Sequence, residues 1–389
     1  MRFAIVRQYY NPDGAVERVT ERALEALLER NVAVSLYTRA WPQTRLQLME
    51  PVICNPYFVG TLWRDWGFAN AACRSIRRTL PTLVEAHAPM LCCDVYLAGD
   101  GVHAVRVEEQ RKHAEALERV SLACSAYGRY LRRTEARLFA SPWLRAVICK
   151  SRMVRDEIRA RFAVPESKLS VVYNPVDGER FHPGVRARRE KTLKWLRIDA
   201  GALIFLVVCR DVEQCAYATV VDALAATPPP AHLVVVCSSQ AARRIRAHAQ
   251  VRGVVSRVTA ADPHADLRPY FGAADVFVAP SIYDPSPDTA LEAMACGLSV
   301  IASSKSGVAE MLGEHQCGLA FAATDTAALV AAMHSLADPA MRARLGENAR
   351  RAALPLSPAA TTLSLVLLYR DLLAASAPAT GPGTTAPTA

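Results

Sequence analysis

The sequence has few of the features that mark membrane-spanning, zinc-binding or repeat proteins. In its 389 residues, no run approaches the roughly 18–20 apolar residues that cross a bilayer. The first residues also lack the long apolar region and the cleavage site of an exported chain. The 11 cysteines include no C-x-x-C pair and no Cys/His cluster with zinc-ligand spacing. These absences predict a globular cytoplasmic protein whose thiols are buried and reduced.

The composition indicates an ordinary folded chain with a basic surface. Hydrophobic residues make up 51% and charged residues 21%, and the length corresponds to two domains at roughly 150 residues each. The 46 Lys and Arg exceed the 37 Asp and Glu, which gives a net charge of +9. A positive balance favours an anionic partner, whether nucleic acid, anionic lipid or a phosphorylated substrate.

The first half of the chain alternates short apolar runs with amphipathic segments. Apolar runs at 2–6 and 32–38 flank turn residues at 11–16 and a helical pattern at 17–30. This order is typical of a β-α-β unit and predicts a parallel sheet. Further elements expected in this half are strands at 91–99 and 145–151 and a charged helix at 151–162.

The alternation restarts after a turn-rich connector, which predicts a second α/β unit. Its expected strands lie at 202–209, 232–239, 274–281 and 298–303. Two doubly wound units in one chain favour a ligand in the cleft between them. The boundaries predicted from this pattern are 1–170 for the first domain, 171–355 for the second, 356–375 for a last apolar helix and 376–389 for a disordered tail.

The strongest chemical pattern lies between the strand at 274–281 and the helix after it. Asp284 follows the strand in a turn-rich loop, Asp288 begins the helix and Glu292 lies within it. A helix start offers free N–H groups to an anion, while the two outer carboxylates can accept hydrogen bonds from a polyol. The alternative is a structural role, with Asp288 as the helix N-cap and Glu292 as a surface residue.

These segments resemble family 4 of the retaining glycosyltransferases. The resemblance rests on a carboxylate at Asp284, a glutamate eight positions later and the following Ala-Met-Ala-Cys-Gly-Leu at 293–298. Supporting segments are those at 12–18, 173–183 and 307–310. The family implies a GT-B fold: an α/β architecture of two doubly wound Rossmann-like domains that face a cleft, with a C-terminal helix that returns to the first domain.

A narrower resemblance is to the branch that builds the lipopolysaccharide core of Gram-negative bacteria. It rests on Ala98–His103 and on the basic segment that begins at Arg129. The branch implies transfer of a sugar from a nucleotide sugar, such as a UDP-hexose, to a lipid-linked core acceptor. It also implies a peripheral location on the inner face of the inner membrane.

The family resemblance implies roles for particular residues. Glu292 is expected at the ribose hydroxyls, and Asp284 at hydroxyls of the donor sugar. Gly14 would let the first loop approach the donor diphosphate. The remaining expected site residues are Asp100 and His103 at the donor sugar or acceptor, Arg210 at the diphosphate, and Asp288, Thr289 and Leu291 at the nucleotide. No metal and no cofactor are expected, because the helix start and basic side chains would neutralise the phosphates.

The segment after the strand at 202–209 departs from the family pattern. Family members usually carry Lys-Gly there, whereas this chain has Cys215-Ala216. Loss of a fixed cation at a leaving diphosphate costs roughly 10²–10³ in rate, by analogy with the loss of one oxyanion donor. An impaired enzyme is therefore one expectation, with Arg152 or Lys305 as substitute cations. A degenerate member that binds nucleotide sugar or a partner without turnover is the alternative.

A basic segment within the first domain suggests a surface for anions. Arginines at 129, 132, 133 and 137 interleave with aromatic and leucine side chains, a pattern that can lie on an anionic membrane face. A solvated helix face is the structural alternative. No helix-turn-helix, zinc finger or RNP-like motif supports nucleic-acid binding, and no segment resembles the cofactor-lysine region of a phosphorylase.

Overall fold

The computed structural model describes residues 2–9, 20, 23, 33–40, 49–114, 116–209, 211–262 and 266–375. The turn expected at 11–16 and most of the helix expected at 17–30 lie outside these residues. The predicted tail at 376–389 also lies outside them.

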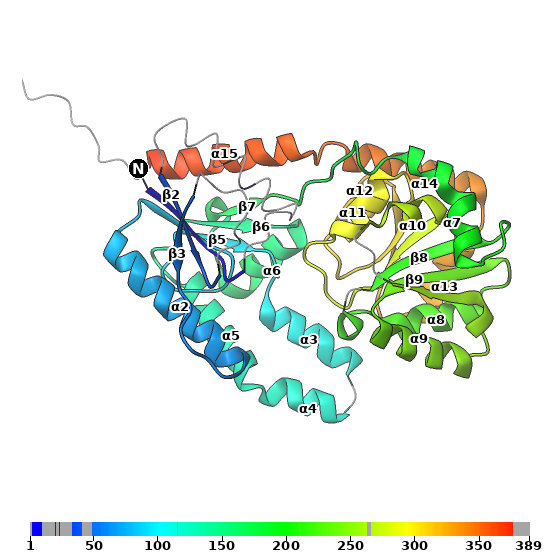
Figure 1. Cartoon of the computed structure of the whole chain (residues 1–389), viewed down its shortest axis with the longest axis horizontal. Coiled ribbons are helices and arrows are strands. Elements are labelled where there is room, and N and C mark those ends of the chain that lie inside the picture. Colours follow the sequence, from blue (N-terminus) through cyan, green and yellow to red (C-terminus); the bar gives the residue numbers. More distant parts are fainter. Residues whose placement is uncertain are drawn as a thin grey trace, which may run out of the picture.

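The first half of the chain forms a seven-stranded sheet in the order β3-β2-β1-β4-β5-β6-β7, and every pair in it is parallel (Figure 1). The strand order reverses beside β1, which is where ligands of doubly wound sheets bind. The strands are β1 Arg2–Val6, β2 Ala33–Thr38, β3 Met49–Ile53, β4 Leu83–Ala86, β5 Val95–Ala98, β6 Ala146–Cys149 and β7 Leu169–Val171. The helices are α2 Gly60–Thr79, α3 His103–His113, α4 Ala116–Cys124, α5 Ala126–Phe139 and α6 Arg152–Phe162, with a 3₁₀ turn η1 at Glu166–Lys168.

Both faces of this sheet are covered by helices, as parallel sheets require. Side chains of α2, α3, α5 and α6 pack on one face, including the buried Phe68, Leu138 and Ile158. The other face is covered by the last helix of the chain, α15 (Pro358–Ala374), through Leu365 and Tyr369 among others. The chain therefore returns to its first domain, as the GT-B expectation requires.

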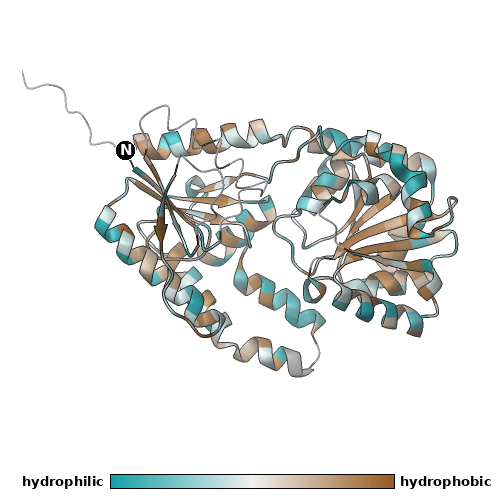
Figure 2. Cartoon of the chain, viewed as in Figure 1, coloured by the Kyte–Doolittle hydropathy of each residue, from teal (hydrophilic) through white to brown (hydrophobic). Residues whose placement is uncertain are grey.

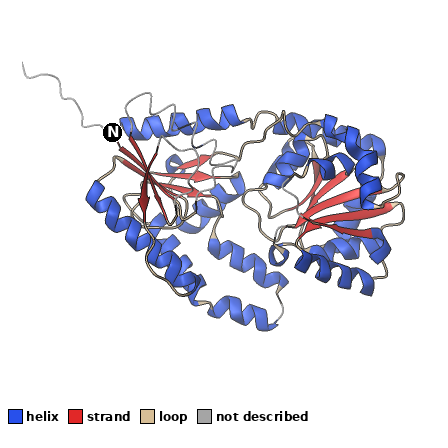
Figure 3. Ribbon diagram, in the orientation of Figure 1, coloured by secondary structure: helices blue, strands red, loops and turns tan. Residues whose placement is uncertain are grey.

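The second half forms a six-stranded parallel sheet in the order β10-β9-β8-β11-β12-β13. Figure 3 shows this sheet with helices around it. Its strands are β8 Leu203–Cys209, β9 Ala231–Cys237, β10 Val258–Ala261, β11 Val276–Ala279, β12 Ser299–Ser303 and β13 Gly318–Phe321. Its helices are α7 Arg189–Leu196, α8 Tyr217–Ala226, α9 Ser239–Val251, α10 Arg268–Ala273, α11 Asp288–Ala295, α12 Ala309–Glu314, α13 Thr326–Ser335 and α14 Pro339–Ala353. The 3₁₀ turns are η2 Pro183–Arg188, η3 Val212–Gln214 and η4 Val255–Arg257.

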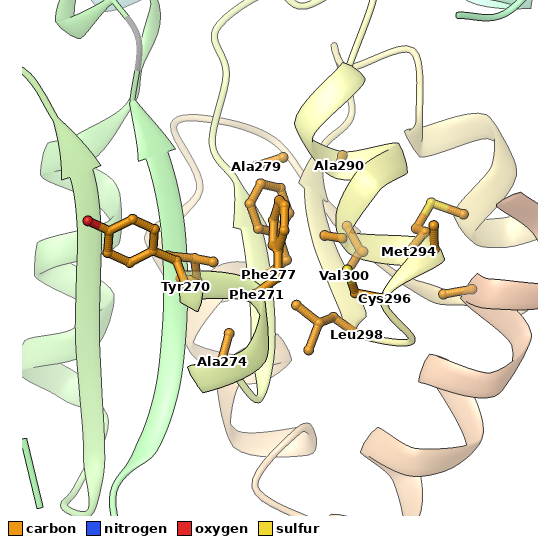
Figure 4. Close-up of a cluster of buried hydrophobic side chains, with 14 of the residues drawn as sticks. Tyr270, Phe271, Ala274, Phe277, Ala279, Ala290, Met294, Cys296, Leu298 and Val300 are labelled. Carbon is orange, nitrogen blue, oxygen red and sulfur yellow. The ribbon is translucent and has the colours of Figure 1, made fainter. Parts of the chain in front are cut away.

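Two apolar layers hold the second sheet between its helices. On one face Phe271, Phe277 and Met294 pack together with side chains of α10, α11 and α14 (Figure 4). On the other face, α8, α9 and α13 contribute side chains such as Ile245 and Leu329. Apolar strands between amphipathic helices, visible in Figure 2, are the physical result of the alternation in the sequence.

One segment near the end of the described chain bears on the expectation that no apolar run is long enough to cross a bilayer. The segment Pro339–Ala374 is long and apolar enough to cross a membrane, judged by length and composition alone, and its most apolar 18 residues have a mean hydropathy of 1.5. The structure divides it into α14, of 15 residues, and α15, of 17 residues, with 354–357 outside both helices. Leu365 and Tyr369 of α15 pack on the first sheet.

The expectation of reduced thiols is wrong for two cysteines. Cys73 in α2 forms a disulfide with Cys92, which precedes β5. The other nine cysteines are unpaired, and all but the exposed Cys124 are buried.

The packing of α15 on the first sheet predicts that two leucines of this helix contribute differently to the stability of the protein. Leu365 is 2% exposed in the core, whereas Leu367 is 40% exposed. We expect Leu365→Ala to lower the free energy of unfolding by about 2–5 kcal/mol, because it leaves a cavity. The matched Leu367→Ala should change it by only about 0.5 kcal/mol. Urea denaturation of both variants measures the difference; equal effects would contradict the packing of α15.

Candidate active site

Three adjoining cavities lie where the two sheets face each other, and Asp100 lines all three. Cavity A, of about 350 Å³, is bounded by the end of β8, η3 and the loop between β11 and α11. Cavity B, of about 460 Å³, lies at the ends of β1 and β6, and cavity C, of about 440 Å³, lies between α2, α3 and α5. The carboxyl ends of the parallel strands thus open onto connected spaces, as sequence reasoning expects.

The loop between β11 and α11 holds Asp284 at the wall of cavity A. Its backbone N–H donates to the carbonyl of Lys305 at 2.9 Å, and its carbonyl accepts from Gly307 N–H at 2.8 Å. One carboxylate oxygen accepts from the N–H of Ser286 at 3.2 Å. These bonds fix the Asp284 backbone while its half-buried side chain lines the cavity.

Asp288 lies between cavities A and B at the start of α11. Its Oδ1 accepts from Asn174 Nδ2 at 2.6 Å, so the segment that joins the two domains holds this carboxylate. The N-cap of α11 is Pro287, without a side-chain bond, so the alternative reading of Asp288 as the N-cap is wrong. Thr289 also lines cavity A.

The other two residues expected on α11, Leu291 and Glu292, are not among the residues that line cavity A. Glu292 is half-buried one turn beyond Asp288 and therefore on the same side of the helix. Leu291 is 1% exposed in the apolar core, so its side chain has no access to cavity A.

Asp100 and His103 bound the cavities from the first domain. The Asp100 side chain is 91% exposed, with its carboxylate 4.0 Å from Arg106. His103 begins α3 and lines cavity C. Burial, with the nearby positive charges of Arg106 and Arg132, lowers the pKa of His103 to about 4. The imidazole is therefore neutral at physiological pH.

Glu135 is a buried carboxyl on α5 that the sequence patterns did not single out as a site residue. Its Oε1 accepts from the N–H of His103 at 2.8 Å, so it holds the first residue of α3. Burial raises the pKa of Glu135 to about 7, because the charged form is desolvated.

Two predicted site residues, Gly14 and Arg210, lie outside the described residues. The structure describes the segment 211–216 that follows Arg210, and this segment contains no lysine. Cys215 is 8% exposed, lines cavity A and pairs with Ser281 in an antiparallel bridge. A hydrogen bond to the Cys209 sulfur, together with burial, raises the pKa of the Cys215 thiol well above its ordinary value. A neutral thiol therefore stands where the family usually has a cation.

The substitute cations suggested for this position are engaged elsewhere. Lys305 Nζ lies 3.2 Å from Glu157 and 3.6 Å from Glu109, both in the first domain. Arg152 pairs with Glu310 and Glu314 of α12. Both cations join the two domains and do not line cavity A.

Tyr283, which the sequence patterns did not assign a role, joins the site loop to the first domain. Its hydroxyl accepts from the N–H of Val102 at 3.0 Å and donates to Glu157 Oε2 at 2.8 Å. Gly101 has φ +69°, and a Cβ there would overlap the Tyr283 hydroxyl. The Gly-Asp-Gly sequence at 99–101 was the available signal for this close approach.

A second carboxylate, that of Glu310, also joins the two domains. The two oxygens of Glu310 accept from the N–H groups of Arg152 and Met153, each at 2.8 Å. These N–H groups are at the start of α6, where the helix dipole favours a negative charge.

No group of three or more His, Cys, Asp or Glu side chains in the described part of the chain is arranged to hold a metal ion.

The chain matches two family models that together span most of its length. The model for Glycosyltransferase Family 4 matches residues 15–180, and the model for Glycosyl transferases group 1 matches residues 188–352. The chain belongs to family 4 of the glycosyltransferases. The first model spans β2 to β7 and the second spans β8 to β13, so the domain that carries Asp100 and the domain that carries Asp284 both match.

The curated relatives of this glycosyltransferase include enzymes with sugar-phosphate products. The alpha-maltose-1-phosphate synthase of Mycolicibacterium smegmatis is 31% identical over 50% of this chain and 54% of its own length. The synthase of the same name from Mycobacterium tuberculosis is 28% identical over 90% of this chain and 94% of its own. The lipopolysaccharide core biosynthesis glycosyltransferase LpsE of Rhizobium meliloti is 28% identical over 38% of this chain and 44% of its own.

Solved structures confirm the GT-B fold. WaaG, a glycosyltransferase involved in lipopolysaccharide biosynthesis, superposes with a TM-score of 0.75 at 20% identity, covering 98% of this chain and all of its own. Anabaena HepE in complex with UDP-glucose superposes with a TM-score of 0.68 at 16% identity, covering 95% of this chain and all of its own.

The Gly101–Tyr283 contact predicts a specific effect in this glycosyltransferase. Gly253 has the same φ of +69° but has no atom within 4 Å of a Cβ built on it. Gly253→Ala should therefore cost only the left-handed strain of about 1–2 kcal/mol. Gly101→Ala should cost roughly 1–3 kcal/mol more, because Tyr283 must move.

Urea denaturation gives the two costs, and small-angle X-ray scattering reports the separation of the domains. We expect only Gly101→Ala to increase the radius of gyration. Equal behaviour of the two variants would contradict the role of Tyr283 as an interdomain contact.

The buried Glu135 predicts a pH dependence of stability. Its pKa rises from an ordinary value near 4.5 to about 7 on folding, so the folded protein holds a proton that the unfolded chain releases. The contribution is fully present below about pH 4.5 and is lost as the pH rises through 7. Between about pH 5 and 8, the wild type should lose on the order of 2 kcal/mol more stability than Glu135→Gln. Parallel urea titrations at the two pH values check this; identical losses would contradict it.

Proposed function

We propose that this glycosyltransferase moves a hexosyl group from a UDP-hexose to a lipopolysaccharide core acceptor with retention of configuration. Cavity A carries the proposal: Asp284, Asp288 and Thr289 of the second domain face Asp100 of the first across it. Support for the donor comes from HepE, whose structure contains UDP-glucose. Support for the acceptor comes from the names of WaaG and LpsE.

In this proposal, residues of both domains contact the donor. Glu292 and Asp288 on α11 hold the nucleotide, and Asp284 accepts hydrogen bonds from hydroxyls of the donor sugar. Asp284 is one methylene shorter than the usual glutamate, so a bridging water completes its contact. Asp100 and the neutral His103 orient the sugar and the acceptor hydroxyl. The leaving phosphate takes the acceptor proton on the same face, so no protein base is assigned.

The described residues around the proposed diphosphate position carry more negative than positive charge, which disfavours a diphosphate. The described walls of cavity A carry the carboxylates Asp100, Asp211, Asp284 and Asp288 and one guanidinium, that of Arg106. We assign neutralisation of the leaving group to Arg210, with Gly14 allowing close approach of the first loop, and no metal or cofactor. With a thiol at Cys215 in place of the usual lysine, turnover is expected to be reduced by roughly 10²–10³.

An anionic membrane surface is the proposed location of the acceptor. On α5 the four arginines Arg129, Arg132, Arg133 and Arg137 are exposed, whereas the nearby Phe139 is buried. The membrane-facing aromatic side chains are instead supplied by α2, where Trp63 is 48% exposed and Trp66 52% exposed. Trp66, Arg129, Arg133 and Arg137 line one hollow of about 560 Å³. Basic and amphipathic aromatic side chains together favour peripheral binding at the inner face of the inner membrane.

Transfer by the purified chain tests this function. We expect UDP-glucose and lipooligosaccharide truncated in its core to give a product heavier by one hexosyl unit in mass spectrometry, with UDP released. Glucose 1-phosphate serves as the competing acceptor, and transfer to it alone would replace the lipopolysaccharide assignment. Binding of UDP without transfer to either acceptor would support the degenerate alternative.

Three variants test the roles that this proposal gives to individual residues. Glu292→Gln should lower kcat/KM by about 10-fold or more, because a charged hydrogen bond to the nucleotide is lost. The matched Glu347→Gln, at an exposed glutamate of α14, should leave it unchanged. Cys215→Lys should raise kcat by restoring a cation at the diphosphate. A Cys215→Lys variant that binds UDP but is no faster would contradict the account of reduced turnover.

A further inference from the structure

Cavity C opens beside cavity A and has walls from both domains. Asp100, Arg106 and Gln214 line both cavities, so a group in cavity C lies next to a ligand in cavity A. Gln214 comes from η3 of the second domain. The other walls come from the first domain, among them residues of α2, α3 and α5, Gln8 after β1, and the segment between β4 and β5.

Buried polar atoms without a hydrogen-bond partner gather around this cavity. Among the described residues, eleven such atoms occur, and five of them belong to side chains that line cavity C. The five are Gln8 Oε1, His103 Nε2, Arg106 Nε, Glu135 Oε2 and Gln214 Oε1. A buried polar atom without a partner costs about 1–3 kcal/mol, so a cluster of them indicates a ligand that supplies the missing partners.

Two of these side chains are held in place by their other atoms. Glu135 is only 2% exposed, and its Oε1 is bonded to the N–H of His103, which leaves Oε2 as the unpaired oxygen. Gln8 donates from Nε2 to Asp65 at 3.1 Å, which identifies Oε1 as its unpaired atom. Both groups are therefore arranged before any ligand binds.

The unpaired atoms define the chemistry of the ligand. Gln8 Oε1 and Gln214 Oε1 are acceptors that require O–H or N–H donors. Glu135 Oε2 accepts when the carboxyl is ionised and donates when it is protonated, and His103 Nε2 accepts or donates according to the tautomer. The fifth is the N–H of Arg106, which requires an acceptor. A sugar hydroxyl both donates and accepts, so a ring that carries several hydroxyls satisfies both kinds.

The charges around cavity C disfavour an anionic ligand. Asp65, Asp100 and Glu135 are carboxyl groups on its walls, and His103 is neutral. Of the two guanidinium groups on its walls, Arg64 is paired with Asp65 at 2.7 Å and Arg106 donates to the carbonyl of Asp100. The described walls therefore have no excess of positive charge for a phosphate.

We propose that cavity C binds an uncharged, hydroxyl-rich glycosyl unit of the acceptor, with Gln8, Glu135 and Gln214 as the residues that select it. The proposal rests on the function proposed above, because it places the acceptor beside the donor in cavity A. The volume of about 440 Å³ is in the range of pockets that enclose small ligands.

Saturation-transfer NMR on the full-length protein with UDP present tests the proposal. The neutral probe is methyl α-D-glucopyranoside, and glucose 1-phosphate is the anionic comparison. We expect saturable binding of the glucoside, weakened about 3- to 10-fold by Gln214→Met and by Gln8→Met, since each removes a hydrogen bond. The matched Gln240→Met, at an exposed position on α9, should not change it.

Separate titration of UDP by calorimetry distinguishes the two proposals. Gln8 lines cavity C but not cavity A, so if Gln8→Met weakens the glucoside while the affinity for UDP is unchanged, the subsite is supported. If the wild type binds the glucoside in the same Gln-dependent way but does not bind UDP, the donor function fails and the subsite stands. Preference for glucose 1-phosphate, no glucoside binding, or equal binding by all variants would overturn the subsite.

Discussion

The arrangement of the site depends on one hydroxyl group, that of Tyr283. It is bonded to the backbone at Val102 and to Glu157, so the loop that carries Asp284 is tied to the segment that carries Asp100. Burial beside Glu157 raises the pKa of Tyr283, so the hydroxyl remains a neutral donor. Because Tyr283 is only 3% exposed, water does not compete for these bonds and they are stronger than at a surface.

Local sequence patterns predict the two sheets well, because their strands are apolar runs between amphipathic helices. The strand expected at 202–209 is observed as β8 at Leu203–Cys209, and that expected at 91–99 shortens to β5 at Val95–Ala98. β3 was missed because Pro51 interrupts its pattern, which an edge strand tolerates. β4 was missed because it has four residues and contains Glu85.

The candidate site also combines residues whose positions follow from local sequence patterns with residues that are brought together only by long-range contacts. The position of Asp284 and Asp288 at a strand end follows from the order of elements, and the structure brings both to cavity A with Asp100. Tyr283 and Val102 are 181 positions apart, and no local pattern encodes such a contact. Likewise, Gln214 gains its place at cavity C only when the second domain is set against the first.

The return of α15 to the first sheet affects the order in which the chain can fold. The second sheet lies between β8 and α14, and its core is completed by side chains from the continuous stretch 176–353. The first sheet buries Phe3 and Ile5 against Leu365 and Tyr369, which lie more than 350 residues later. During synthesis on the ribosome, the part of the first sheet that α15 covers therefore stays exposed until Pro358–Ala374 has emerged. The domain that is made first is completed last.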